Sequence, residues 1–468
     1  MHRIRRSAAK ILIATTLLSA TCSQCMALGA EDISTPATNQ LTAIENITNE
    51  IVRAEIQLMK LSTEFHVSWM KPNKWKSWRI FAYKLSGSGL TNAGMITIAA
   101  SRFKYLDNPS DAPLPFLKAG HIINLTAASV LLGGTLLETA LDRLTERRFA
   151  KAHLDCKSAL SSFSNARSKL DALIAQRKKL LSSSEGLSDK QREILEADGD
   201  VLSDLRELIS KEFARSYSDV AHYRGTRDLA NLTTAFGAST AGYMGSLNSL
   251  LSVSNHRPRQ TAVAGSGFIT SGASVVVAPL LTKFGSDFAV KRAEATLRKN
   301  DIDVPENVAD NFDVHRQKLD DLIAKVSPDD MRLMQALQAR QSAYSIHNNI
   351  FDGRHNLRLA RKAQAKRELK GRLFFSSIVG GTNIARGTQL AVAGLNYYDE
   401  PSSIFKLVAS ASTCYIVGSG VWTADNIQGK VREELSKRKT PGGKLSVHAK
   451  LIEDLGDLDD MEDSMAIY

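Results

Sequence analysis

The sequence predicts an all-α fold, a three-fold tandem repeat of long helical hairpins that gives six long up-down helices. A pair of apolar runs rich in glycine and serine occurs three times, at residues 85–141, 229–284 and 373–424. Charged segments separate the pairs, and their apolar residues recur at spacings of three and four, the pattern of a coiled-coil seam. Short stretches also recur in the same order, 128–133 with 273–278 and 169–175 with 318–324. Recurrence of this kind is typical of proteins built from copied supersecondary units.

The first 30 residues predict a secretory signal peptide, because a basic start precedes a short apolar run and then small residues. Two of the four cysteines, Cys22 and Cys25, fall inside it, so we expect no disulfide framework. The signal also holds four of the positive charges, and without them the formal net charge falls from +11 to +7. So small an excess argues against a dedicated nucleic-acid-binding protein.

Repeat 1 is expected at residues 31–141, where an amphipathic helix leads into the first apolar hairpin, and repeat 2 at residues 142–284. Repeat 2 starts with a coiled-coil hairpin, 142–228, and ends with the apolar hairpin 229–284. The seam of its first helix has lapses at two arginines, Arg167 and Arg177. Its second helix is expected to begin at a capping box, in which Ser188 and Gln191 each satisfy the other's backbone N–H group.

Repeat 3 is expected at residues 285–424, with a charged hairpin at 285–372 and the last apolar hairpin at 373–424. The basic run from Arg354 to Arg372 is interpreted as a solvated helix face, with nucleic-acid or lipid binding as the alternative. Residues 425–468 are expected to form a C-terminal helix with a solvated acidic tail, and docking of that tail on the stalk is the alternative.

The apolar runs are about twenty residues long, as a membrane-spanning helix requires. Their small residues recur at helical spacings, which in a bilayer lets helix backbones approach closely. We therefore expect membrane insertion, with a soluble bundle packed through the same residues as the alternative. The expected helix-packing positions are Gly94, Ser101, Gly133, Gly245, Ser252, Ala278, Gly387, Gly394 and Gly418. Four polar residues in or near the runs would line a path between the hairpins of a channel, namely Asn231, Asn248, Asn383 and Arg386.

The orientation in the membrane is predicted differently by two signals. A cleaved signal peptide places the charged stalks outside the cytoplasm of a bacterial-type cell. Basic residues beside the stalk-side ends of the apolar runs would place the same stalks inside. We adopt the orientation given by the signal peptide, and the alternative localisation is a soluble periplasmic or secreted protein.

No catalytic, cofactor-binding or metal-binding constellation is recognisable in the sequence. The glycine-rich triplets at 265–267 and 418–420 lack a phosphate-binding lysine, and His153 with Cys156 falls short of the four ligands of structural zinc. We therefore expect a non-catalytic structural or protein-interaction role. The expected partners are membrane lipid and either another protein or a second copy, with no nucleic acid, small-molecule substrate or cofactor. A membrane channel or transport component is the alternative, and an enzyme that depends on His121 is the third hypothesis.

Overall fold

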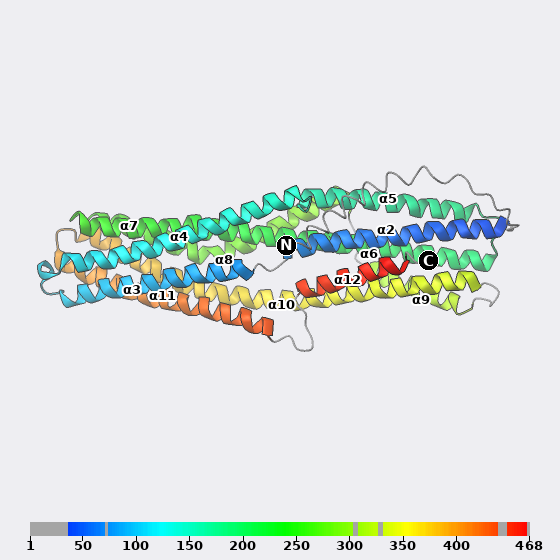
Figure 1. The fold of residues 1–468 in the computed structure, drawn as a ribbon. Helices are drawn as coiled ribbons and strands as arrows, with labels where there is room; N and C mark the ends of the chain where they lie inside the picture. Colours follow the sequence, from blue (N-terminus) through cyan, green and yellow to red (C-terminus); the bar gives the residue numbers. More distant parts are fainter. Residues whose placement is uncertain (1–35, 71–73, 303–307, 326–330, 439–446, 466–468) are drawn as a thin grey trace.

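The computed structural model describes residues 36–70, 74–302, 308–325, 331–438 and 447–465. In these ranges every regular element is a helix, which confirms the all-α prediction. The helices lie along the axis of one elongated rod (Figure 1). The predicted signal peptide lies outside the described residues.

One half of the rod, here called the stalk, is built from charged amphipathic helices. It contains α2 (Pro36–Met70), α5 (Cys156–Ser182), α6 (Asp189–Asn231), α9 (Val308–Ile323), the first part of α10 (Met331–Asn396) and α12 (Val447–Met465). The other half, here called the ring, contains the apolar hairpins. Its helices are α3 (Lys74–Lys104), α4 (Leu114–Lys151), α7 (Thr240–Ser254), α8 (Gln260–Arg298), the end of α10 and α11 (Pro401–Arg438).

The ring is a closed circle of six helices in chain order. Each of its helices packs against the next one along the chain, and α11 returns to pack against α3. The three hairpin turns follow α3, α7 and α10, and they gather at the end of the rod remote from the stalk (Figure 1). The first turn contains a short 3-10 helix, η2 (Pro109–Asp111). The predicted apolar hairpins are therefore helical hairpins that stand side by side.

One long helix runs without a break from deep in the stalk to the hairpin-turn end of the ring. This is α10, whose 66 residues extend over about 100 Å at 1.5 Å per residue. The connection between α6 and α7 passes through a π-helix, η3 (Leu232–Ser239), in which the Ser239 hydroxyl donates to the carbonyl five residues back, that of Thr234. The charged segment expected to continue from residue 142 is interrupted, because α4 ends at Lys151 and Asp155 caps a new helix through the N–H groups of Lys157 and Ser158.

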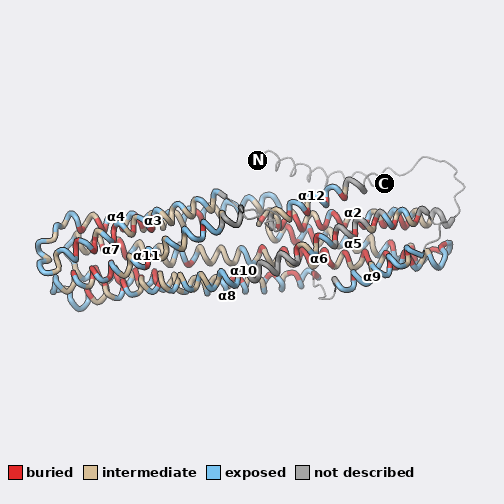
Figure 2. The backbone as a smooth tube through the Cα atoms, turned by 90° about the horizontal axis from the view of Figure 1, so that it is seen from below, coloured by how far each residue is buried: buried red, intermediate tan, exposed pale blue. Residues whose placement is uncertain are grey.

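The stalk holds the larger apolar core. Phe163 of α5 and Phe213 of α6 are fully buried and stack with ring centroids 3.8 Å apart. The predicted capping box at the start of α6 is confirmed, since Ser188 and Gln191 bond reciprocally to each other's backbone. Figure 2 shows that buried positions occur along both halves of the rod.

The C-terminal helix α12 is docked on the stalk, so the expectation of a solvated acidic tail is wrong for its described residues. Leu458 and Met461 enter the stalk core, and Asp454 is completely buried. Lys60 of α2 forms ion pairs with Asp459, at 2.7 Å, and with Glu462. Docking, the alternative interpretation, is what the structure shows, and it depends on apolar residues that alternate with the acids.

Candidate functional site

The outer surface of the ring is rich in large apolar side chains. The exposed ones include Phe103, Phe116, Ile122, Leu136, Leu137, Phe236, Val263, Phe284, Phe288, Phe374 and Val417. Among the described residues, three helical segments are long and apolar enough to cross a membrane, by length and composition: Leu114–Ser182, Gln260–Arg298 and Pro401–Arg432. The first contains α4 and α5, the second is α8, and the third is most of α11; α4, α8 and α11 are the second helices of the three hairpins.

The interior of the ring is polar by comparison. Its buried apolar cluster is small, formed by Met95, Ile98, Ala264, Phe268, Leu390, Val408 and Ala411. Buried polar side chains surround it, among them Ser88, Thr91, Arg102, His121, Asn124, Ser246, Ser271, Asn383, Arg386, Ser412 and Ser419. Soluble proteins bury mainly apolar residues, so the ring is unusual in burying many polar side chains while it exposes large apolar ones.

Several expected packing residues lie at close helix contacts. A Cβ atom on Gly387 would lie 2.6 Å from the carbonyl oxygen of Gly265, and one on Gly94 would lie 2.8 Å from that of Gly120. The remaining close contacts are those of Gly394 with Ala262, Gly245 with Phe268 and Gly418 with Thr382. Gly272 faces Gly380 in the same way and was missed by sequence reasoning, although its seven-residue spacing from Gly265 is a readable signal.

Four other expected packing residues have different surroundings. Gly133 is exposed with open space around it, whereas the adjacent Gly134 packs under the ring of Tyr83. The Ser101 hydroxyl is bonded within its own helix to the carbonyl of Thr97. The Ser252 hydroxyl lies 2.7 Å from that of Thr261, across the α7–α8 turn. Ala278 is half-buried, and its carbonyl accepts from the Thr282 hydroxyl.

The structure does not bring the four expected polar-path residues together. Asn231 lies at the stalk-side end of the ring and donates to Asp142 at 3.3 Å. Asn248 donates to the carbonyl of Met244 in its own helix. Only Asn383 and Arg386, one turn apart on α10, are buried in the interior, where the Asn383 Oδ1 atom has no hydrogen-bond partner. A path lined by all four residues is therefore absent from this conformation.

A cationic cluster, defined by Arg102, His121 and Arg386, lies inside the ring instead. The Arg386 guanidinium lies 3.5 Å from the ring centroid of Phe268 and 4.4 Å from that of Tyr415. The Arg102 guanidinium lies 3.9 Å from the ring centroid of Phe405. The charges of both arginines act on His121. Sequence reasoning identified Arg386 but not Arg102, because Arg102 stands two residues before the end of α3, where a solvent-facing arginine is ordinary.

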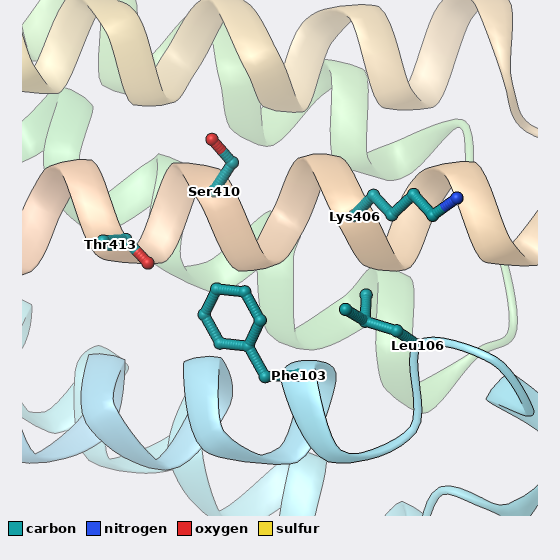
Figure 3. A pocket seen from close by; sticks show the side chains of 5 residues that line it. All are labelled: Phe103, Leu106, Lys406, Ser410 and Thr413. Atoms are coloured by element: carbon teal, nitrogen blue, oxygen red, sulfur yellow. The ribbon is translucent and has the colours of Figure 1, made fainter.

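A shallow open groove of about 320 Å³ lies close to the hairpin turns, where α11 meets α3 (Figure 3). Phe103 and Leu106 line one side, and Lys406, Ser410 and Thr413 of α11 line the other. Its lining is mixed and it contains no acid, so it offers no constellation for general acid–base chemistry.

The polar groups inside the stalk form ion networks. Asp198 is fully buried and accepts from Arg177 at 2.9 Å, Arg340 at 2.6 Å and the Tyr344 hydroxyl at 2.9 Å. Arg354 donates to Asp454 at 2.8 Å and to the Thr63 hydroxyl at 2.9 Å. Burial, followed by the charge of Asp198, raises the pKa of Tyr344 well above its ordinary value. These networks join helices from distant parts of the chain, so they serve the architecture.

Among the described residues no group of three or more His, Cys, Asp and Glu side chains is placed to hold a metal ion. The chain matches no protein-family model, no curated protein and no solved structure.

Proposed function

We propose that the protein is a membrane-inserted helical bundle with a structural or protein-interaction role, in which the ring is embedded in the bilayer and the stalk projects from it. The observation that carries this proposal is the reversed arrangement of the ring, with large apolar side chains outside and polar ones inside. In lipid, apolar side chains on the outside cost nothing, and helices associate through small residues and interhelical polar contacts. In water the same surface would promote aggregation.

The spacing of amphipathic residues along the ring agrees with the thickness of a bilayer. At the stalk side, Trp75 is 78% exposed, and the Lys430 ammonium lies 4.5 Å from the ring centroid of Trp78. At the hairpin-turn side, the Lys104 ammonium lies 5.4 Å from the ring centroid of Tyr105. Trp and Tyr prefer the two membrane interfaces. The 27 residues from Trp78 to Tyr105 extend over about 40 Å, close to the thickness of a bilayer with its headgroups.

Alkaline carbonate extraction of membranes from cells that make the full chain tests this proposal. We expect the protein to stay in the membrane pellet, because a ring surrounded by acyl chains is not released when peripheral proteins are. Release into the supernatant would contradict membrane insertion.

The proposed orientation, with stalks outside the cytoplasm, is tested by single-cysteine labelling of intact cells with an impermeant maleimide. Glu185→Cys, at the stalk tip between α5 and α6, should be labelled if the stalk is outside. Ser110→Cys, in the first hairpin turn, is the matched control and should react only after the membrane is opened. The opposite result would support the orientation given by the basic flanks.

The second candidate function is a membrane channel or transport component, which is favoured by the buried polar residues of the ring. Proteoliposomes that contain the full chain would show ion flux, and Arg386→Ala would change it while leaving the assembly intact. Flux equal to that of protein-free vesicles would leave only the structural role.

We also propose that the three hairpins descend from one copied unit. The recurrent stretches 128–133 and 273–278 fall on α4 and α8, the second helices of the first two hairpins, and the hairpins follow one another around the ring. Superposition of α3–α4, α7–α8 and α10–α11 in an experimental structure, with Gly94, Gly245 and Gly387 in register, is the expected result. Hairpins that pair with different registers would contradict a common origin.

A further inference from the structure

The two arginines of the cationic cluster are buried and lack any anionic partner. Arg102 is 6% exposed and Arg386 is 4% exposed. Within the described part of the chain neither guanidinium has an ion pair or a hydrogen bond. The only groups in that part of the chain that stabilise the charge of either guanidinium are the faces of aromatic rings. Arginine keeps its proton under all ordinary conditions. The ring therefore encloses two positive charges without a compensating carboxylate.

Unpaired buried charge of this kind is expensive. A guanidinium transferred from water to a protein interior loses its hydration, and contact with an aromatic face compensates for only part of that loss. Arg386 lies ten residues from the end of α10, so its Cα atom is about 15 Å below the hairpin turn. It is therefore too deep for its side chain to reach the surface at the turns, and a compensating charge must come from inside the ring.

Other groups around the arginines are also without partners. The Nε2 atom of His121 and both amide atoms of Asn124 are buried and have no hydrogen-bond partner, and the same is true of the Nε atom of Arg102. His121 and Asn124 lie one turn apart on α4, so they share a face of that helix. Guanidinium and amide N–H groups are donors, and an imidazole nitrogen becomes one in the appropriate tautomer. An excess of free donors beside two positive charges suits an anion.

We propose that the ring binds a small inorganic anion, with the charge and size of chloride, between Arg102, His121 and Arg386, with the Asn124 amide as a further donor. The apolar side chains of Met95, Ile98 and Leu390 fill the adjacent interior and favour a weakly hydrated monovalent ion over phosphate or sulfate. The anion would bind in the same place whether the ring is a structural anchor or a conduction path.

Chloride titration of the full chain in detergent micelles tests the proposal, at constant ionic strength with gluconate as the replacing anion. The readout is the excess line width of the chloride NMR signal. We expect an excess line width that falls as added chloride saturates the site, and that nitrate suppresses. Arg386→Gln and Arg102→Gln should each weaken binding about tenfold or more, because each removes one of the two charges. Arg257→Gln, an exposed arginine in the second hairpin turn, is the matched control and should bind as the unmodified protein does.

An excess line width that nitrate does not suppress, or that is equal in Arg386→Gln and the unmodified protein, would overturn the proposal. Asn124→Ala keeps both arginines and removes only a neutral side chain, so it serves if the arginine variants do not fold, and it should also weaken binding. Unchanged binding in that variant would contradict the site as placed here. The measurement needs no bilayer, so its outcome is separate from that of carbonate extraction.

Discussion

At the scale of single residues, the stalk contains buried carboxyl groups of two kinds. Asp198 accepts hydrogen bonds from donors on α5 and α10, so its buried oxygens have partners. Glu55 of α2 is equally buried, but neither of its oxygens has a hydrogen-bond partner. Burial raises the pKa of Glu55 well above its ordinary value, the charge of Asp198 adds to that rise, and Arg206 opposes it. Folding therefore favours the protonated form of Glu55.

Because the pKa of Glu55 is raised, we expect replacement of Glu55 to stabilise the protein by an amount that depends on pH. A carboxyl group whose pKa is higher in the folded than in the unfolded protein costs nothing below its unfolded pKa, and it destabilises increasingly as the pH rises above that value. Glu55→Gln should therefore raise the thermal midpoint more at pH 8 than at pH 5. Glu50→Gln, on the exposed side of α2, is the control. An equal effect of Glu55→Gln at both pH values would contradict a protonated carboxyl group.

At this scale the sequence reveals residues that are unusual for their position, but not the residues that they contact. The lapse in the α5 seam at Arg177 is visible in the sequence, and the structure explains it, because this arginine bonds to Asp198, to the carbonyl of Leu195 and to the Thr48 hydroxyl. Those partners belong to α2 and α6, so no local pattern identifies them. Arg386 is similarly visible as a charge in an apolar run, but its neighbours Phe268 and Tyr415 come from two other helices.

At the scale of helices, the closest packing in the ring lies between α8 and α10. Gly265 and Gly272 of α8 face Gly387 and Gly380 of α10, and a Cβ atom at any of these positions would meet the backbone of the other helix. The helical periods and small-residue spacings of these segments are readable in the sequence, because they reflect one face of one helix. The break at residues 152–155 and the π-helix before α7 are not, because both depend on how neighbouring helices are placed.

Because α8 and α10 pack so closely, we expect the effect of replacing a glycine of α10 on stability to depend strongly on which glycine is replaced. Gly387→Ala should destabilise the protein by about 1–3 kcal/mol, the usual cost of overpacking, because its methyl group would lie 2.6 Å from the Gly265 carbonyl oxygen. Gly381→Ala has open space around it and is the matched control. It should be neutral or stabilising by up to about 1 kcal/mol, since alanine favours the helix. Unfolding in mixed micelles measures both, and equal effects would contradict the close contact.

At the scale of the whole molecule, segments from the two ends of the chain meet twice. In the stalk α12 packs on α2, and in the ring α11 packs on α3, where the Ser419 hydroxyl bonds to Asn92. The sequence predicts six helices and their turns, but it contains no sign that they close into a circle. Closure depends on contacts between residues far apart in the chain, and a single sequence does not reveal such pairs.

Because α12 is docked through a buried ion pair, we expect loss of that pair to destabilise α12 more than the rest of the protein. Asp454→Asn leaves the Arg354 guanidinium without its nearest carboxylate, and removal of one partner of a buried pair typically costs about 3–5 kcal/mol. Hydrogen exchange should therefore accelerate throughout residues 447–465 while the ring stays protected. Asp459→Asn, whose side chain is 70% exposed, is the control and should have little effect. Acceleration limited to the substituted residue would show that α12 is held by its apolar contacts alone.

Closure of the ring through its first and last helices has a consequence for synthesis. While the ribosome is still translating the third hairpin, α3 lacks the neighbour that covers one of its flanks, and Arg102 lacks the aromatic face of Phe405. A nascent chain in which only α3, α4, α7 and α8 have packed together is thus an open arc with a guanidinium at its edge. The ring closes only when α11 has been made, so a chain that ends after Arg102 but before residue 401 leaves the Arg102 charge uncovered.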